Sequence, residues 1–289
     1  MKNGLLCAAL LLAPLTMSLA ASAQNADSPC PLCTTWNAPQ APFHVYGNTY
    51  YVGTHGLSSI LLVSSQGLVL IDGDLPDAPP QIAAHIRALG FDIKNVKLIL
   101  NTHAHFDHAG GISALQKMSG ATVEASPWSA AVFKSGGVGK DDPQYGAVRP
   151  IAPVAKVKVL QDGQTVHLGD VALTAHFTPG HTPGGTSWTW TSCEKGRCLN
   201  MVYTDSLTAV SADGYKFTVH PKVMASFEKS FKTVDALPCD ILLTPHPEFS
   251  DVMGRMQKGN FVDPNACHAL VAKSRDAFAK RLADEEAKK

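Results

Sequence analysis

Apolar and polar residues follow two different periods along this chain. Short apolar runs bounded by glycine, asparagine or proline predict strands, and stretches with an apolar residue every three or four positions predict helices. In the first half the expected strands are 45–46, 49–52, 59–63, 68–71, 96–100 and 122–125, and the expected helices are 79–90 and 110–118.

The second half echoes this order of strands followed by helices. Its expected strands are 154–160, 164–168, 171–177, 186–191, 201–204 and 240–243, and its expected helices are 221–237 and 266–283. Strands followed by helices, twice, indicate two sheets packed together with helices outside, in an α/β or α+β fold. We find no sequence repeat and no low-complexity linker, so we expect residues 24–289 to form a single domain.

The N-terminus has the pattern of a secretory signal peptide at residues 1–23. A charged start at Lys2 precedes a largely apolar run from Leu5 to Leu19, and Ala21-Ser-Ala23 has the form of a cleavage site. We therefore expect an exported, soluble protein without a membrane anchor. The formal net charge is zero, which argues against nucleic acid as a partner and agrees with a small, weakly charged substrate.

Cysteine usage fits an oxidising compartment. Removing the signal segment removes Cys7 and leaves an even number: Cys30, Cys33, Cys193, Cys198, Cys239 and Cys267. The pair at 193 and 198 flanks a hairpin-like turn that a disulfide could close, and the pair at 239 and 267 could tie a strand to the last helix. The Cys30-Pro-Leu-Cys33 pair could be a short disulfide or two free thiols.

The strongest chemical signal is the stretch from Asn101 to Gly111, Asn-Thr-His-Ala-His-Phe-Asp-His-Ala-Gly-Gly. It follows an apolar strand, and alternate side chains of an extended chain point the same way, so His103, His105 and Asp107 converge. His108 follows at the turn into a helix. Imidazole nitrogen and carboxylate oxygen are the usual zinc ligands of catalytic sites, so this stretch predicts a metal site.

Two further histidines stand among turn residues directly after predicted strands. His181 lies in Thr-Pro-Gly-His-Thr-Pro-Gly-Gly, and His246 lies in Leu-Thr-Pro-His-Pro. Either one alone reads as an ordinary core or surface histidine. With the first cluster present, both become candidate ligands, because one metal site needs more donors than that cluster supplies.

This pattern of His-x-His-x-Asp-His, a distant Pro-Gly-His and a later histidine resembles the metallo-β-lactamase superfamily, and most of all the third subclass of its lactamases. The resemblance covers about residues 43–285 and includes Tyr203-Thr-Asp-Ser-Leu-Thr-Ala209; Cys239 and Cys267 also resemble a disulfide of that subclass. It implies a four-layer αβ/βα sandwich with a two-zinc site. It also implies a periplasmic enzyme whose metal-bound hydroxide opens the β-lactam ring and confers antibiotic resistance.

Carried over by position, the resemblance implies a role for each candidate residue. The first zinc would be held by His103, His105 and His181, and the second by Asp107, His108 and His246. The first three and Asp107 would form the catalytic set, with Asp107 also orienting the nucleophile. The substrate carboxylate would bind to Ser206 and Thr208, which otherwise read as ordinary strand-end hydroxyls.

Three positions remain interpretations at this stage. Asp205 stands where many hydrolases of the superfamily carry an aspartate that bridges two zincs, but six ligands suffice for the lactamase, so we leave Asp205 outside the metal set. Asp72 is expected to support the metal loop through hydrogen bonds. Trp36 either lines the cleft or has only a packing role.

Other functions remain open on the same pattern. A thioesterase or a lactonase of this fold would use nearly the same metal chemistry. An exported zinc-binding protein without activity would more typically show a flexible His-rich tract. No coiled-coil heptad or large apolar helix face indicates a protein partner, so we expect a monomer that acts on a small molecule.

Overall fold

The computed structural model describes Met1 and residues 30–287, so all but the first residue of the expected signal peptide lies outside the described residues. Two sheets form the centre of the fold. The first has seven strands in sequence order: β1 (Phe43–Tyr46), β2 (Thr49–Tyr51), β3 (Ile60–Ser64), β4 (Gly67–Ile71), β5 (Val96–Leu100), β6 (Thr122–Ala125) and β7 (Val157–Val159). Strands β1 to β4 are antiparallel, whereas β4 to β7 are parallel.

The second sheet has five strands in the order β12, β11, β10, β9, β8. Their bounds are β8 (Thr165–Leu168), β9 (Val171–Phe177), β10 (Thr186–Glu194), β11 (Arg197–Tyr203) and β12 (Ile241–Leu243). Strands β10 and β11 form a hairpin whose two-residue turn, Lys195-Gly196, has positive φ at both positions. That conformation matches the twist of paired strands and is why glycine occurs there.

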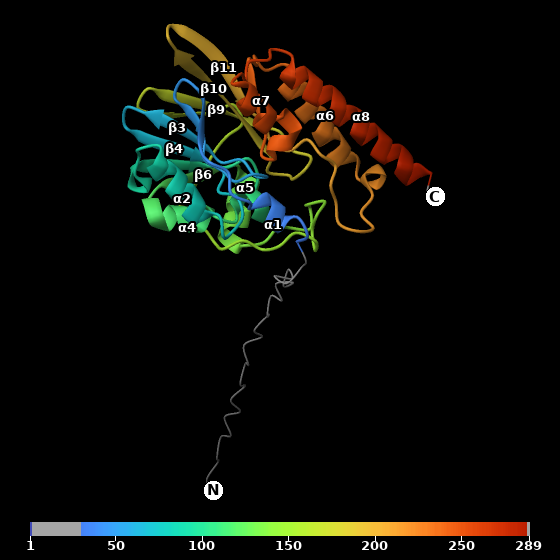
Figure 1. Ribbon diagram of the computed structural model, residues 1–289. Helices are drawn as coiled ribbons and strands as arrows, with labels where there is room; N and C mark the ends of the chain where they lie inside the picture. The colour runs from blue at the N-terminus through green and yellow to red at the C-terminus, as the bar shows by residue number, and fades with distance from the viewer. Residues whose placement is uncertain (2–29, 288–289) are drawn as a thin grey trace.

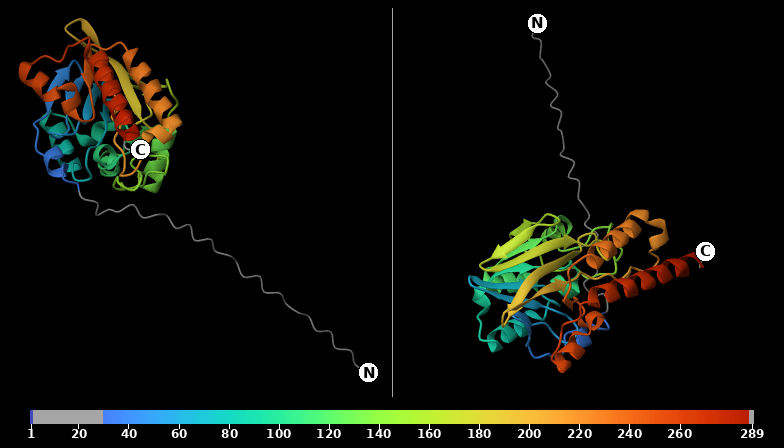
Figure 2. Two further views of the ribbon diagram at one scale, coloured as in Figure 1. Left: turned by 90° about the vertical axis from the view of Figure 1, so that its right-hand side faces the viewer. Right: turned by 90° about the horizontal axis from the view of Figure 1, so that it is seen from above.

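Helices cover both outer faces of the paired sheets (Figure 1). Against the first sheet pack α2 (Pro79–Ala88), α4 (Ile112–Ser119) and α5 (Pro127–Ser135), and against the second pack α6 (Pro221–Asp235) and α8 (Ala266–Glu286), which lie side by side (Figure 2). Shorter elements are α1 (Cys33–Trp36), α3 (Phe106–Ala109), α7 (Val252–Lys258), η1 (Ile93–Asn95), η2 (Phe217–Val219) and η3 (Pro247–Ser250).

Three apolar cores separate these layers. Tyr51 and Trp188 are fully buried in the core between the sheets, Ile86 lies in the core beneath α2, and Phe227 of α6 contacts Phe278 of α8 at 4.5 Å between ring centroids. Helix, sheet, sheet and helix therefore stack in four layers. The predicted αβ/βα sandwich is confirmed, because each sheet is apolar on both faces and each face needs a partner layer.

Periodicity did not predict four short helices: α1, α3, α5 and α7. Ser126 caps the start of helix α5, where its hydroxyl accepts a hydrogen bond from the Ser129 N–H. The helix ends at Gly136, which has φ 82°. Helix α7 is shorter still, and η3 precedes it. In the opposite direction, β7 covers only three of the seven residues expected at 154–160. Sequence-based prediction misses such short elements because they have too few positions to show a hydrophobic period.

All six cysteines outside the expected signal segment are paired. Cys193 and Cys198 face each other across the β10–β11 hairpin, and the other bonds join Cys239 to Cys267 and Cys30 to Cys33. The first two pairings confirm the sequence-based expectation, and the third resolves the open alternative in favour of a disulfide. Among the described residues, none of the helices combines the length and apolarity that a bilayer span requires.

We expect the disulfide between residues 239 and 267 to contribute most to stability. It closes a loop of 28 residues and fixes the start of α8. Cross-linking a loop of this size removes unfolded-state entropy worth about 3.6 kcal/mol. The double variant Cys239→Ala/Cys267→Ala should lose about that much free energy of unfolding in urea titrations. Cys30→Ala/Cys33→Ala, which opens a loop of three residues, is the matched control, and an equal loss in both would contradict the prediction.

Candidate metal centre

The loop after β5 carries four of the candidate ligands. His103 and His105 lie between the end of β5 and the start of α3, and Asp107 and His108 occupy the first turn of that helix. Asp72, at the end of β4, accepts hydrogen bonds on its two carboxylate oxygens from the Thr102 N–H, at 2.7 Å, and the Thr102 hydroxyl, at 2.9 Å. The expected supporting role of Asp72 is confirmed.

The remaining two candidate ligands come from the second half of the chain. His181 follows β9 in a turn where Gly180 has φ 147°, and a Cβ at that glycine would lie 2.9 Å from the Phe227 ring. His246 follows β12 directly before η3. The two sheets meet at this edge, and strand ends from both therefore bring their loops to one place.

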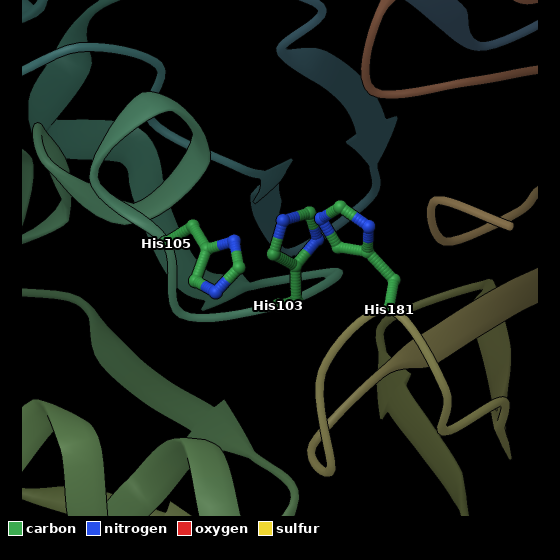
Figure 3. A group of neighbouring side chains, drawn as sticks. All are labelled: His103, His105 and His181. Carbon is green, nitrogen blue, oxygen red and sulfur yellow. The ribbon is translucent and has the colours of Figure 1, made fainter. Parts of the chain in front are cut away.

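His103, His105 and His181 form the first trio (Figure 3). The centroid of the His103 ring is 4.8 Å from that of His105 and 4.9 Å from that of His181, and the last two rings are 5.2 Å apart. One nitrogen from each lies within 4.8 Å of the others, and all three residues are buried. Such a group of converging nitrogens is suited to one metal ion.

Asp107, His108 and His246 form the second trio. Asp107 Oδ2 lies 3.4 Å from Nε2 of His108 and 3.4 Å from Nε2 of His246, and the two rings are 4.7 Å apart. The rings of His103 and His108 are only 4.6 Å apart, so the two trios are neighbours. The structure therefore brings all six predicted ligands together.

In each histidine of the first trio, one ring nitrogen, here called the outer nitrogen, has a hydrogen-bond partner outside the trio. His103 Nδ1 lies 2.7 Å from Asp205 Oδ1, His105 Nε2 lies 3.0 Å from Asp142 Oδ2, and His181 Nδ1 lies 2.8 Å from the Thr208 carbonyl oxygen. The carbonyl of Thr208 can only accept, so Nδ1 of His181 is the donor. Outer partners of this kind fix the ring orientation and leave the other nitrogen for a metal.

Burial keeps most of these rings neutral. It lowers the pKa of His103 and His108 well below the ordinary histidine value, and it lowers the pKa of His181 to about 3 with help from the two other rings. Burial also lowers the pKa of His105, but the carboxylates of Asp142, Asp107 and Asp205 together outweigh it and the pKa is raised. Burial raises the pKa of Asp107, yet the nearby histidines hold it well below its usual range. Neutral imidazoles and an ionised carboxylate are the protonation states that metal ligands need.

The donor set fits zinc on two observations. Among the described residues, Nε2 of His103 and both ring nitrogens of His108 are buried without a hydrogen-bond partner, which is costly unless another ligand satisfies them. Two donors on one tetrahedral zinc, each about 2.0–2.1 Å from the ion, lie roughly 3.3 Å apart. The 3.4 Å spacings in the second trio match that separation.

A cleft of about 730 Å³ opens above the two trios. Trp36 of α1 lines it and packs its ring 5.0 Å from that of His246, so Trp36 is a cleft residue. Thr208 lines the same cleft. Ser206 instead lines an adjoining cavity of about 220 Å³, whose wall also includes Thr208. Of the two hydroxyls expected to bind substrate, the structure places only Thr208 on the cleft wall.

Two residues near the trios had no signal in the sequence. Asp142 and Gln144 lie in the connection between α5 and β7, and Gln144 Nε2 is 3.3 Å from His181 Nε2. Neither residue belongs to a motif or a periodic element, and only the folded path of this connection brings them to the site. Asp205, which the sequence interpretation left outside the metal set, lies behind His103 on the side away from the trio.

Comparisons with known proteins agree with this geometry. Residues 52–193 match the family model described as metallo-β-lactamase superfamily. The solved structure of Rm3 metallo-β-lactamase is 53% identical, with a TM-score of 0.87, 89% of this chain covered and 99% of that chain. MEM-A1, a subclass B3 metallo-β-lactamase from a soil metagenome library, is 49% identical, with a TM-score of 0.85, 88% of this chain covered and 100% of that chain.

Curated relatives of other activities match shorter segments. A hydroxyacylglutathione hydrolase of Anaeromyxobacter dehalogenans is 33% identical over 48% of this chain and 42% of its own length. The N-acyl homoserine lactonase AttM of Agrobacterium fabrum is 35% identical over 36% of this chain and 39% of its own length. This chain thus aligns with less than half the length of either curated relative.

The chain belongs to the metallo-β-lactamase superfamily. Its fold is the metallo-β-lactamase fold, and the most similar structures described above include a subclass B3 lactamase. The chain is a hydrolase of that superfamily, and it carries buried histidine and aspartate groups that could hold a metal ion.

Proposed function

We propose that this chain is a periplasmic metallo-β-lactamase that hydrolyses the β-lactam amide bond at a centre of two zinc ions. His103, His105 and His181 would hold the first zinc. Asp107, His108 and His246 would hold the second. The observation that carries the proposal is the meeting of both trios at the floor of one cleft, in a chain that aligns over most of its length with lactamase structures.

Zinc bound at these trios would act as a Lewis acid and lower the pKa of water to about 7, which supplies a nucleophile at neutral pH. The chain's own residues determine where that chemistry occurs. The Asp107 carboxylate is ionised and faces the cleft, so it can accept a hydrogen bond from the nucleophile and orient it. The buried rings exclude bulk water from the side away from the cleft.

Substrate contacts follow from the cleft wall. Thr208 presents its hydroxyl near His181, with Oγ1 3.1 Å from Nδ1 of that ring, and its carbonyl fixes the same ring. A substrate carboxylate placed beside Thr208 would lie in the same cleft as Trp36, whose indole offers an apolar surface for a ring system. We retain Ser206 as a second candidate contact, from the adjoining cavity.

Asp205 bears on the choice between this proposal and the thioesterase alternative. An aspartate that bridges two zincs would have to point into the space between the trios. Here Asp205 Oδ1 lies 2.7 Å from Nδ1 of His103, and a Cβ at Gly185 would collide with its other oxygen, so its carboxylate is packed behind the ring. That position supports a role in holding His103 and favours the lactamase.

Hydrolysis of β-lactams by the purified chain tests the proposal directly. We expect ring opening of a chromogenic cephalosporin and of a carbapenem, loss of turnover with a zinc chelator, and recovery when zinc is restored. A thioester and an acyl homoserine lactone should react far more slowly under the same conditions. A folded, zinc-loaded protein that hydrolyses one of these two substrates but neither β-lactam would replace the proposal with the corresponding alternative.

A further inference from the structure

The connection between α5 and β7, residues 136–156, runs along the cleft and contacts the metal centre through the side chains of Asp142 and Gln144. Gln144 and Val148 of this connection line the cleft. Asp142 stands between them and the α5 end, and it is buried, with only 1% of its surface exposed. A carboxylate buried in a loop is costly unless its oxygens are satisfied, so its contacts reveal what it does.

Each polar group of Asp142 has a partner. Its Oδ2 lies 3.0 Å from His105 Nε2, and its Oδ1 accepts from the Gln144 N–H at 2.7 Å. Its backbone N–H donates to the Gly139 carbonyl, and its own carbonyl accepts from the Tyr145 N–H, each at 3.0 Å. One side chain thus closes a turn in the cleft-lining segment and binds that segment to a candidate ligand.

The neighbouring Asp141 has no such connection. Its side chain is exposed and accepts from the Trp128 indole N–H at 2.9 Å, on the α5 side of the segment. Asp141 and Asp142 therefore carry the same charge on adjacent residues of the same segment, but only Asp142 contacts His105. The chain itself supplies a matched comparison for the bond between Asp142 and His105.

We propose that Asp142 is a positioning residue that fixes the proton of His105 on Nε2 and couples metal binding to the ordering of segment 139–148. The inference rests on the first zinc site of the proposed function. With Nε2–H donated to a carboxylate, the lone pair on Nδ1 of His105 faces the trio. Ordering the segment then favours the metal, and the metal favours the ordered segment, because such coupling is reciprocal.

The direction of this coupling follows from charge. A cation bound at Nδ1 withdraws electron density from the ring and makes Nε2–H a stronger donor, and both partners of the bond are buried, where a charge-assisted bond is strong. Metal binding therefore tightens the bond that holds Asp142. The effect reaches Gln144 through the turn that Asp142 closes, and so reaches the cleft wall.

Zinc affinity is the primary test, measured by competition with a chromophoric chelator. We expect Asp142→Asn to weaken zinc binding by about 10- to 100-fold. This is the range found when a metal-ligating histidine loses the hydrogen-bond partner of its other ring nitrogen. Asp141→Asn should stay within about threefold of the unsubstituted protein, since it removes the same charge from the same segment but not the bond. Asp142→Ala, which removes the acceptor entirely, should bind at least as weakly as Asp142→Asn.

Backbone amide hydrogen exchange in segment 139–148 distinguishes this coupling from a purely local role of Asp142, which would leave that exchange unchanged. In the unsubstituted protein and in Asp141→Asn, zinc should slow exchange of backbone amides in 139–148. In Asp142→Asn that slowing should be lost while the exchange of β5 and β10 stays unchanged, which also reports that the variant is folded.

Unchanged zinc affinity in both Asp142 variants would overturn the inference, as would equal losses in Asp141→Asn and Asp142→Asn. A protein that takes up no zinc at all would overturn it together with the metal centre. None of these measurements uses a β-lactam. Zinc binding that depends on Asp142 therefore supports its role even in a protein whose turnover proves to be that of a lactonase or thioesterase.

Discussion

Replacing His181 by alanine should lower kcat/KM for a cephalosporin by about 10²- to 10³-fold, the scale on which removing one preorganised electrostatic partner acts. The substitution removes one of three donors of the first trio. It also releases the Thr208 carbonyl, which the His181 Nδ1–H bonds at 2.8 Å, and so disturbs the cleft wall at the same time. Steady-state kinetics and the zinc content of the purified variant check both consequences.

His176 is the matched control for that experiment. It lies five residues earlier, on β9, and its ring bonds the Thr189 hydroxyl at 2.9 Å instead of facing the trio. His176→Ala should keep its zinc and stay within about threefold of full activity, because the substitution removes a half-buried ring whose hydrogen bond lies within the sheet and so affects mainly local stability. Full activity in His181→Ala would contradict the assignment of His181 to the metal site. An equal loss of activity in His176→Ala would show that the effect is not specific to His181.

Asp107→Asn should lower kcat by about 10²- to 10⁴-fold, the contribution of a positioned proton acceptor. The amide keeps the shape of the side chain but removes the negative charge that lies 3.4 Å from both His108 and His246. The second trio should then hold its metal more weakly, and the nucleophile should lose its acceptor. Kinetics at saturating zinc separate the two losses, because excess metal restores only the first.

The control for Asp107 is Asp77, an exposed aspartate that precedes α2. Asp77→Asn removes the same charge at the surface, so kcat and zinc content should both stay unchanged within about twofold. A wild-type kcat in Asp107→Asn at ordinary zinc levels would show that neither the ligand role nor the orienting role belongs to this carboxylate.

Much of the fold can be predicted from the sequence, because long helices and strands repeat their hydrophobic pattern over many residues. Helix α6 presents an apolar residue at nearly every turn, β4 is a continuous apolar run and β5 is interrupted only by Lys97, so the sequence predicts all three. Short elements such as α7 and β7 are decided by what they pack against, and sequence-based prediction misplaces or omits them. The same contrast between local and distant causes applies to the site.

The six candidate ligands were predictable because their pattern is local. His103, His105 and Asp107 alternate within one loop, and His181 stands beside a proline and a glycine that mark a turn at a strand end. Whether a side chain can bind a metal depends on its donor atoms, and these follow directly from the residue type. The sequence by itself predicted a metal site, its candidate donors and two of the cysteine pairs, and it is the source of our expectation that the protein is exported.

Only the tertiary structure decided what stands behind those ligands. Asp205 belongs to the segment after β11 and Asp142 to the connection before β7, yet each holds a ring of the first trio by its outer nitrogen. Nothing local marks Asp142, and the sequence pointed to Asp205 only as a possible zinc bridge. A hydrogen bond across more than thirty positions of chain depends on how the two sheets pack and where their loops cross. The same packing placed Thr208 on the cleft wall and Ser206 in the cavity beside it.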